Sequence, residues 1–253
     1  MKCLTPINLG SVSSPNLVPC GQCYACQTNN RNSWDLRLRI EHYESNYSSF
    51  VTLTYSDLHL PKDRFVKSEH HSEFMKNLRS LDRITKFRYY SVAEYGERTN
   101  RPHMHYLFFF DRDIDFYRLV DLSWEYGFID VGKVTDASIH YVTKWHINPK
   151  HRPDTDSKEI HGFTRQSKGI GRLLLDNLTV DNIQPTYFFK GKRFPISRYY
   201  RKKLGFDVTD VEDIYSYIKR KYDLKTDKQI TSKIAELQKI FEEKLNSPRK
   251  SIF

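Results

Sequence analysis

Two histidines one residue apart give this sequence its clearest chemical signal. His103 and His105 lie in segment 101–110, which is otherwise rich in apolar and aromatic residues and predicts a buried strand. Side chains at i and i+2 point to the same face of a strand, so both imidazoles can bind one ion. Glu94 stands near the end of another strand-like run, and the turn-prone residues 96–100 separate the two runs. A β-hairpin would bring this carboxylate beside both histidines.

A tyrosine and a lysine follow at helical spacing. Tyr141 and Lys144 stand one turn apart in residues 136–146, which predict a helix with Asp136 as its N-cap. A phenol is almost fully protonated at neutral pH, so attack on phosphorus needs a base or a nearby positive charge, which Lys144 supplies. A packed aromatic ring with an ordinary surface lysine is the competing interpretation.

A divalent ion held by two nitrogens and one oxygen polarises a phosphate through its open coordination positions. Together with the tyrosine and the lysine, these ligands predict phosphodiester cleavage. Mg²⁺ or Mn²⁺ fits that chemistry, because phosphoryl transfer uses hard, exchangeable ions, and zinc is the alternative occupant.

All four cysteines lie in the first 26 residues, as Cys3, Cys20, Cys23 and Cys26. This spacing is typical of metal ligands rather than of a disulfide framework. Four thiolates suit a structural, tetrahedral Zn²⁺ ion. An iron–sulfur cluster and free thiols are the alternatives, although Asn30 stands where the cluster motif has a further Cys-Pro.

The formal charge of +10 over 253 residues favours a polyanionic partner. A basic and aromatic run predicts contacts with single-stranded DNA, with a solvated basic surface as the alternative. These candidate DNA-binding residues, to which one arginine of the histidine segment is added, are Arg101, Arg198, Tyr199, Tyr200, Arg201 and Lys202. The sequence has no apolar run of membrane-spanning length and does not begin with the apolar core of a secretory signal, which predicts a cytoplasmic protein without a membrane partner.

The hydrophobic periodicity predicts an α+β fold, a mostly antiparallel sheet with flanking helices. The predicted helices are 32–43, 72–81, 115–124 and 136–146, and the predicted strands are 49–55, 87–93, 103–110 and 128–134. Residues 148–168 predict a loop, Gly169–Gly171 a backbone nest for a phosphate, 209–212 a capping box and 230–245 an amphipathic helix. The expected domains are a Cys-rich knuckle (1–30), a central domain (31–205) and a helical C-terminal extension (206–253).

These motifs resemble those of rolling-circle replication initiators of the HUH endonuclease superfamily. Phe50–Asp57 is similar to their first motif, Arg101–His105 to their metal motif and Tyr141–Lys144 to their nucleophile motif. The sequence resembles still more closely the initiators of gokushovirus-type phages of the Microviridae, over about residues 1–205. The blocks that carry this likeness are Val18–Cys26, Glu94–Gly96, Trp124–Gly127, Ser167–Gly171 and Pro195–Tyr200.

The resemblance implies a metal-dependent, origin-specific single-strand DNA endonuclease and ligase. Its tyrosine, here Tyr141, would form a 5′-phosphotyrosine and free a 3′-OH primer, while His103, His105 and Glu94 would hold the ion and Lys144 would assist. The implied partners are single-stranded or supercoiled viral origin DNA, the host polymerase and helicase and, in a homodimer, a second copy. The implied location is the cytoplasm of the bacterial host.

Trp145 departs from the pattern, because initiators of this type often carry a second tyrosine there. This favours a single-tyrosine route, with termination by another protomer or by a tyrosine such as Tyr199 or Tyr200. Two other classes compete with the initiator. One is a non-catalytic protein that binds single-stranded nucleic acid. The other is a related HUH relaxase or transposase, which would share the chemistry and differ in its DNA.

Overall fold

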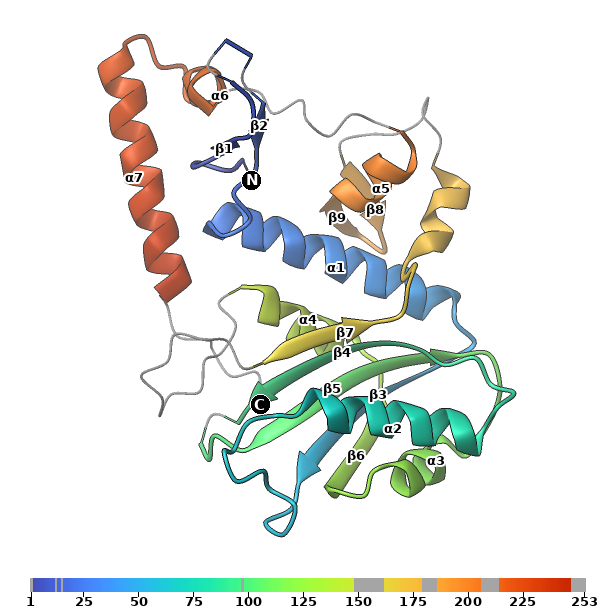
Figure 1. The fold of residues 1–253 in the computed structure, drawn as a ribbon. Coiled ribbons are helices and arrows are strands. Elements are labelled where there is room, and N and C mark those ends of the chain that lie inside the picture. Colours follow the sequence, from blue (N-terminus) through green and yellow to red (C-terminus); the bar gives the residue numbers. More distant parts are fainter. Residues whose placement is uncertain are drawn as a thin grey trace. The chain divides into compact units, whose positions relative to one another are not determined.

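The computed structural model describes residues 2–11, 13–14, 16–96, 98–147, 162–178, 186–205 and 214–246 (Figure 1). Its contacts divide the chain into two compact units, which are treated separately below. The sheet unit comprises residues 37–145 and 149–174, and the other unit comprises residues 1–36, 146–148 and 175–253. The domain boundaries expected from the sequence stay a prediction.

The sheet unit is built on five antiparallel strands. In chain order they are β3 (Tyr47–Tyr55), β4 (Arg88–Tyr95), β5 (Pro102–Phe110), β6 (Gly127–Lys133) and β7 (Phe163–Gln166). Side by side their order is β6-β3-β5-β4-β7, and every neighbouring pair is antiparallel. The central position of β5 explains why nearly all its residues are buried. The α+β class predicted from the sequence is confirmed.

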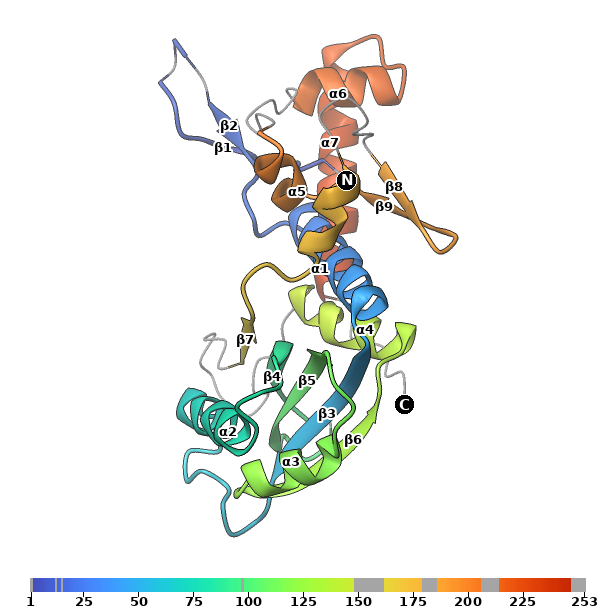
Figure 2. The same ribbon diagram turned by 90° about the vertical axis from the view of Figure 1, so that its right-hand side faces the viewer.

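Helices cover both faces of this sheet (Figure 2). On one face lie α2 (Ser68–Leu81) and α3 (Phe116–Ser123), and on the other lies α4 (Asp136–Thr143), followed by the 3₁₀ turn η1 (Lys144–His146). The core between the sheet and the first two helices includes Met104, Tyr106, Phe108, Phe110, Phe74, Leu78, Phe116 and Val120. The even-numbered residues of β5 therefore face this core, and the odd-numbered ones face α4.

The cap of α4 differs from the prediction. Thr135, not Asp136, is the N-cap: its hydroxyl accepts a hydrogen bond from the Ser138 N–H (3.1 Å), and the Ser138 hydroxyl accepts one from the Thr135 N–H (2.8 Å). This reciprocal pair is a capping box. The Asp136 carboxylate instead pairs with the buried Arg39 guanidinium, which ties the start of α4 to α1 (Tyr24–Glu44).

Two predictions about residues 148–171 were wrong. β7 lies within the segment predicted as a loop, of which residues 148–161 are outside the described part. The nest at Gly169–Gly171 is filled from within the protein: the Gly171 N–H donates to the Glu41 carboxylate (2.7 Å), and Arg37 Nε donates to the Ile170 carbonyl (2.9 Å). An internal carboxylate thus takes the place that the sequence suggested for a phosphate.

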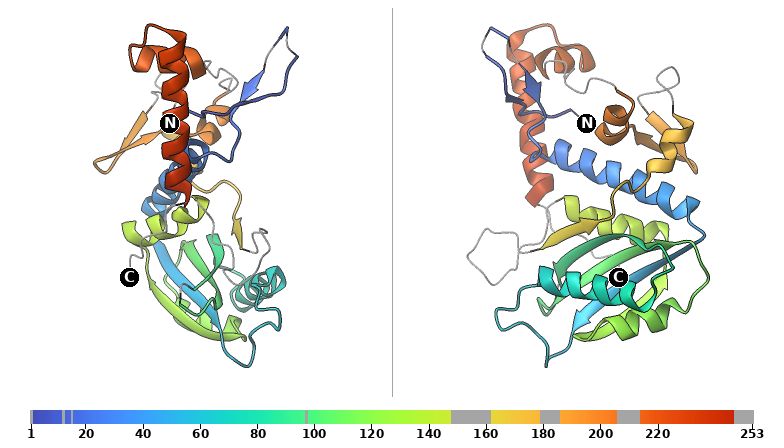
Figure 3. Two further views of the ribbon diagram at one scale, coloured as in Figure 1. Left: turned by 90° about the vertical axis from the view of Figure 1, so that its left-hand side faces the viewer. Right: turned by 45° about the vertical axis from the view of Figure 1, so that its right-hand side comes forward.

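The other unit contains short strands and helices (Figure 3). They are β1 (Ile7–Asn8), β2 (Leu17–Val18), β8 (Thr186–Phe189), β9 (Lys192–Pro195), α5 (Arg198–Lys203), α6 (Ile214–Lys221) and α7 (Asp227–Asn246), and η2 (Arg172–Asn177) crosses the boundary between the units. α1 also crosses it and begins eight residues before the predicted helix. Phe241 of α7 packs on Tyr24 of α1, with ring centroids 5.4 Å apart.

The capping box predicted at 209–212 lies outside the described residues. Among the helices that are described, none combines the length and apolar character needed to cross a membrane.

Candidate active site

The β4–β5 hairpin brings the three predicted metal ligands together. Glu94 is the cross-strand partner of His103, and His105 lies two residues further along β5 on the same face. The Glu94 Oε1 atom lies 3.7 Å from His103 Nε2 and 3.5 Å from His105 Nε2. One potential ligand atom from each of the three residues lies within 4.8 Å of the others. The hairpin expected from the spacing is therefore present.

The second nitrogen of each imidazole contacts the protein. His103 Nδ1 lies 3.1 Å from the Arg101 carbonyl oxygen, which can only accept, so the ring proton lies on Nδ1. His105 Nδ1 lies 3.0 Å from the Thr52 hydroxyl. Such anchors are typical of histidines that bind a metal through Nε2. Two nitrogens and one carboxylate oxygen with open positions fit a divalent ion, and this donor set passes that chemical test.

Tyr141 points its hydroxyl into the same cluster. This half-buried residue of α4 donates a hydrogen bond of 2.6 Å to Glu94 Oε1. Its ring lies edge-on to His105, with centroids 5.0 Å apart and planes at 86°. Lys144 begins the 3₁₀ turn that directly follows α4, and Trp145 comes next. The predicted nucleophile thus lies beside the predicted metal ligands, with the lysine one helical turn away.

The environment of Glu94 favours its charged form. Burial opposes ionisation, since the residue is only 3% exposed, but the imidazoles of His103 and His105 and the Tyr141 hydroxyl outweigh it. Together they hold the pKa of Glu94 well below its usual range. Glu94 is therefore a carboxylate at neutral pH, as a metal ligand requires.

Arg101 is bonded to the end of β3. Its guanidinium donates to the Tyr55 carbonyl (2.7 Å) and forms an ion pair with Asp57. Its own carbonyl is the acceptor for the His103 ring. The sequence suggested a DNA contact for Arg101, whereas these bonds link it to the histidine anchor. Sequence reasoning missed Thr52 and Asp57 as functional residues, although both lie in the block that resembles the first initiator motif.

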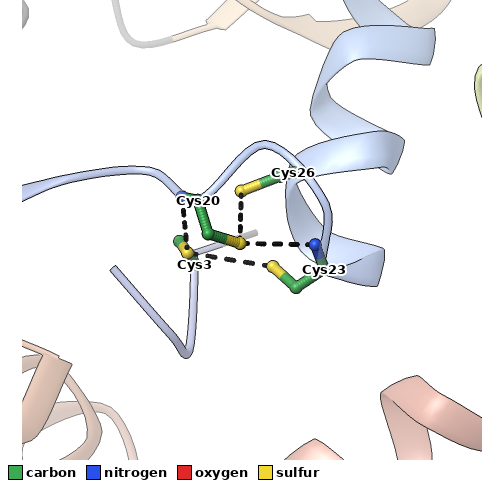
Figure 4. Close-up of side chains that lie close together, drawn as sticks. All are labelled: Cys3, Cys20, Cys23 and Cys26. Atoms are coloured by element: carbon green, nitrogen blue, oxygen red, sulfur yellow. Dashed lines mark hydrogen bonds between the residues drawn. The ribbon is translucent and has the colours of Figure 1, made fainter. Parts of the chain in front are cut away.

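The four cysteines form a second candidate metal site, in the other unit (Figure 4). The β1–β2 hairpin brings Cys3 and Cys20 together, and Cys23 and Cys26 lie around the start of α1. Cys20 Sγ is 3.9 Å from Cys26 Sγ, and Cys23 Sγ is 3.8 Å from Cys3 Sγ. A tetrahedron with Zn–S bonds of about 2.3 Å has S···S edges of about 3.8 Å. The thiols therefore fit a tetrahedral ion.

The thiols differ in acidity. Burial alone would raise the pKa of Cys20, but hydrogen bonds from the Thr5 hydroxyl and the Cys23 N–H help to lower it to about 6. Burial raises the pKa of Cys3 and raises that of Cys26 strongly. One thiol of the set is thus readily ionised, while two would have to lose protons to a bound ion.

The basic and aromatic run lies on α5. Arg198, Arg201 and Lys202 are exposed, and Tyr199 is half-buried. Tyr200 is fully buried and packs against the Tyr199 ring, with centroids 5.1 Å apart. In this structure Tyr200 is a core residue and presents no ring to a DNA base, and the other four stay predictions.

The fold and the clustered side chains define an α+β protein with a candidate divalent-metal site beside a tyrosine. Residues 48–148, which include the whole cluster, match a family of phage replication proteins, described as the replication-associated protein ORF2 family. The resemblance to microvirus-type replication proteins is therefore confirmed.

Individual relatives extend the likeness beyond this segment. The chain is 28% identical over 233 residues to Replication-associated protein ORF2 of Spiroplasma virus 4, covering 81% of this chain and 72% of that protein. It is 26% identical over 242 residues to Replication-associated protein VP4 of Bdellovibrio phage phiMH2K, covering 79% and 76%. It is 25% identical over 149 residues to Replication-associated protein ORF4 of Chlamydia phage 1, covering 51% and 37%.

One solved structure is also similar, the hypothetical protein ORF119 from Sulfolobus islandicus rod-shaped virus 1. The likeness covers 49% of this chain and 95% of that one, at 20% identity. Its TM-score of 0.30 is too low to carry an argument.

Proposed function

We propose that this protein initiates rolling-circle replication of a phage genome as a metal-dependent, origin-specific single-strand DNA endonuclease and ligase. The observation that carries the proposal is the hydrogen bond from Tyr141 to Glu94, beside the Nε2 atoms of His103 and His105. The names of the family and of the relatives support the role in replication. A protein that acts on viral origin DNA would work inside the host cell.

In the proposed cleavage step, the Tyr141 oxygen forms a bond to the scissile phosphorus and the bond from phosphorus to the 3′ oxygen breaks. The phenol loses one proton and the departing 3′ oxygen gains one, so the step is balanced. The 5′ phosphate stays on Tyr141, and the free 3′-OH can prime a polymerase. In the reverse step, a 3′-OH attacks the phosphotyrosine and rejoins the strand.

The side chains divide the work. His103, His105 and Glu94 would hold Mg²⁺ or Mn²⁺, which when bound polarises the phosphate. Glu94 also orients the phenol, but its low pKa makes it a weak base at neutral pH. The Lys144 ammonium would stabilise negative charge on the phenolic oxygen.

For the four cysteines we propose a structural zinc ion. The S···S distances of 3.8 and 3.9 Å support this assignment. A set of four thiolates fills a tetrahedral ion completely and leaves no position for a substrate. The proposed role is therefore to stabilise the fold around the start of α1.

The replacement Tyr141→Phe tests the nucleophile, because it removes only the phenolic oxygen. Tyr117→Phe is a matched control, since Tyr117 lies on α3 with 58% of its surface exposed. Each protein is incubated with Mn²⁺ and overlapping single-stranded fragments of the encoding genome and then run on a denaturing gel. The wild-type and control proteins should form a covalent protein–DNA band, and Tyr141→Phe should form none while melting at the wild-type temperature. An adduct on another residue would overturn the proposal.

A further inference from the structure

One row of cross-strand partners runs from the candidate active site to the edge of the sheet. Glu94 of β4 pairs with His103 of β5, His103 with Thr54 of β3, and Thr54 with Phe128 of β6. Directly opposed residues of antiparallel strands point to the same face. Phe128 therefore shares the face of the metal ligands. At about 4.8 Å between strands, it lies about 10 Å from His103.

The β6 end of this face is open. Phe128 is 66% exposed, which is unusual for a large apolar ring on a strand. Asp130, the next β6 residue on the same face, is also exposed. At Gly132, the one after it, an added Cβ would meet no atom within 4 Å. At the other end of the row, Tyr141 of α4 reaches over Glu94. A strand of DNA leaving the active site thus has room toward β6.

The chemistry of this surface suits a base and not a phosphate. Neither Phe128 nor Thr54 carries a positive charge, and Asp130 beside them would repel a phosphate. An aromatic ring stacks on the face of any nucleobase, which is how proteins hold single strands without reading their sequence. Such a contact needs the ring to be exposed, as Phe128 is.

We propose that Phe128 is a stacking subsite for a base of single-stranded DNA close to the scissile phosphate. This inference rests on the proposed function and names a substrate contact within it. The base would lie on the Phe128 ring, with its sugar and phosphate on the side away from Asp130. The subsite would hold the strand while Tyr141 attacks, and it would contribute to binding without depending on the metal.

The test compares two probes of equal length and charge. One is a fluorescent twelve-nucleotide oligothymidine, and the other is the same backbone with abasic sites in place of the thymidines. Anisotropy is measured without divalent ions, in the Tyr141→Phe background, so that no cleavage can occur. Phe128→Ser should raise Kd for oligothymidine about 5- to 150-fold, the range for loss of one base stack. It should change Kd for the abasic strand by less than about twofold. Phe128→Trp should restore binding.

The control is Tyr117→Ser, which removes an exposed ring from α3 on the other face and should affect neither probe. Equal losses on both probes, or no loss on oligothymidine, would overturn the subsite. The outcome is separate from that of the adduct assay. A protein that forms the adduct but fails here keeps the proposed nuclease and loses the subsite. A protein that stacks thymidine through Phe128 but forms no adduct keeps the subsite and loses the nuclease.

Discussion

The two candidate metal sites are built in different ways. Glu94, His103 and His105 are fixed by the register of two long neighbouring strands, and their second contacts are protein oxygens. The cysteines are gathered by a two-residue hairpin and the start of a helix, and their closest contacts include each other. The first set offers three ligands and the second offers four.

This difference predicts different roles. Three protein ligands leave open positions at which a phosphate can bind, and a preformed sheet can keep its shape without the ion. Four thiolates leave no open position, and a short hairpin has little hydrophobic core to hold it without the ion. We therefore expect the sheet site to serve chemistry with an exchangeable ion and the thiol site to serve stability.

The strongest test of this comparison is His105→Gln. It should lower strand cleavage at least about 100-fold, because the phosphate loses its polarising ion. EDTA should have the same effect on the wild-type protein. His59→Ala is the control, since His59 is exposed and lies outside the cluster. The melting temperature and the zinc content of His105→Gln should stay close to wild type. Cleavage that survives both treatments would remove the metal from the mechanism.

The reciprocal change is Cys20→Ser. Wild-type protein should contain about one zinc per chain by elemental analysis, and the variant should lose it together with several degrees of melting temperature. The fraction that stays folded should cleave DNA at nearly the wild-type rate per molecule. A variant that keeps its stability but loses cleavage would reverse the roles assigned to the two sites.

Arg101→Lys separates a positioning role from a DNA contact. Lysine lacks the fork with which Arg101 bonds both Tyr55 and Asp57, so the carbonyl that orients His103 should lose its support. The Mn²⁺ concentration for half-maximal cleavage should rise about 10- to 100-fold, as for other losses of metal-orienting contacts. Affinity for DNA should change little.

Arg98→Lys is the matched control for that test, because Arg98 is an exposed arginine of the same hairpin loop. It should leave both quantities unchanged. If Arg101→Lys instead weakens DNA binding and its salt dependence while the metal requirement stays constant, then Arg101 is the DNA ligand that the sequence suggested.

The sequence predicted the metal cluster because its geometry is local. His103 and His105 share a strand face by the two-residue period, and a short loop fixes the register that sets Glu94 opposite His103. The antiparallel sheet and the cysteine cluster followed from similarly local patterns. Tyr141 reached the cluster only through the packing of α4, for which the resemblance to a family was the available signal.

The missed features depend on contacts between distant segments. Arg101 bonds Tyr55 across 46 residues, and Gly171 bonds Glu41 across 130. Local periodicity carries no information about such partners. The burial of Tyr200 was missed for the same reason, because a tyrosine in a basic run can face either the core or the solvent. Phe128 was also missed, since its place in the active-site row requires three strand registers.

The smallest expected difference between the sites is the number of protons that each releases on binding its ion. At pH 7 Cys20, with a pKa of about 6, is already largely ionised, whereas Cys3 and Cys26 have pKa values raised by burial and must each lose a proton. Zinc binding should therefore release at least two protons. Because metal and protons compete for the same sulfurs, lowering the pH should weaken zinc binding by about tenfold per released proton and pH unit.

Glu94 should release no proton when Mn²⁺ binds, because its pKa lies below the usual range and the carboxylate is already charged. Titrating metal-free protein with each ion in two buffers of different ionisation enthalpy gives the proton count calorimetrically. Cys26→Ser should reduce the count for zinc by one and leave that for Mn²⁺ unchanged. Release of fewer than two protons by zinc would mean that the thiols are ionised before the ion arrives, against the effect of burial on Cys3 and Cys26.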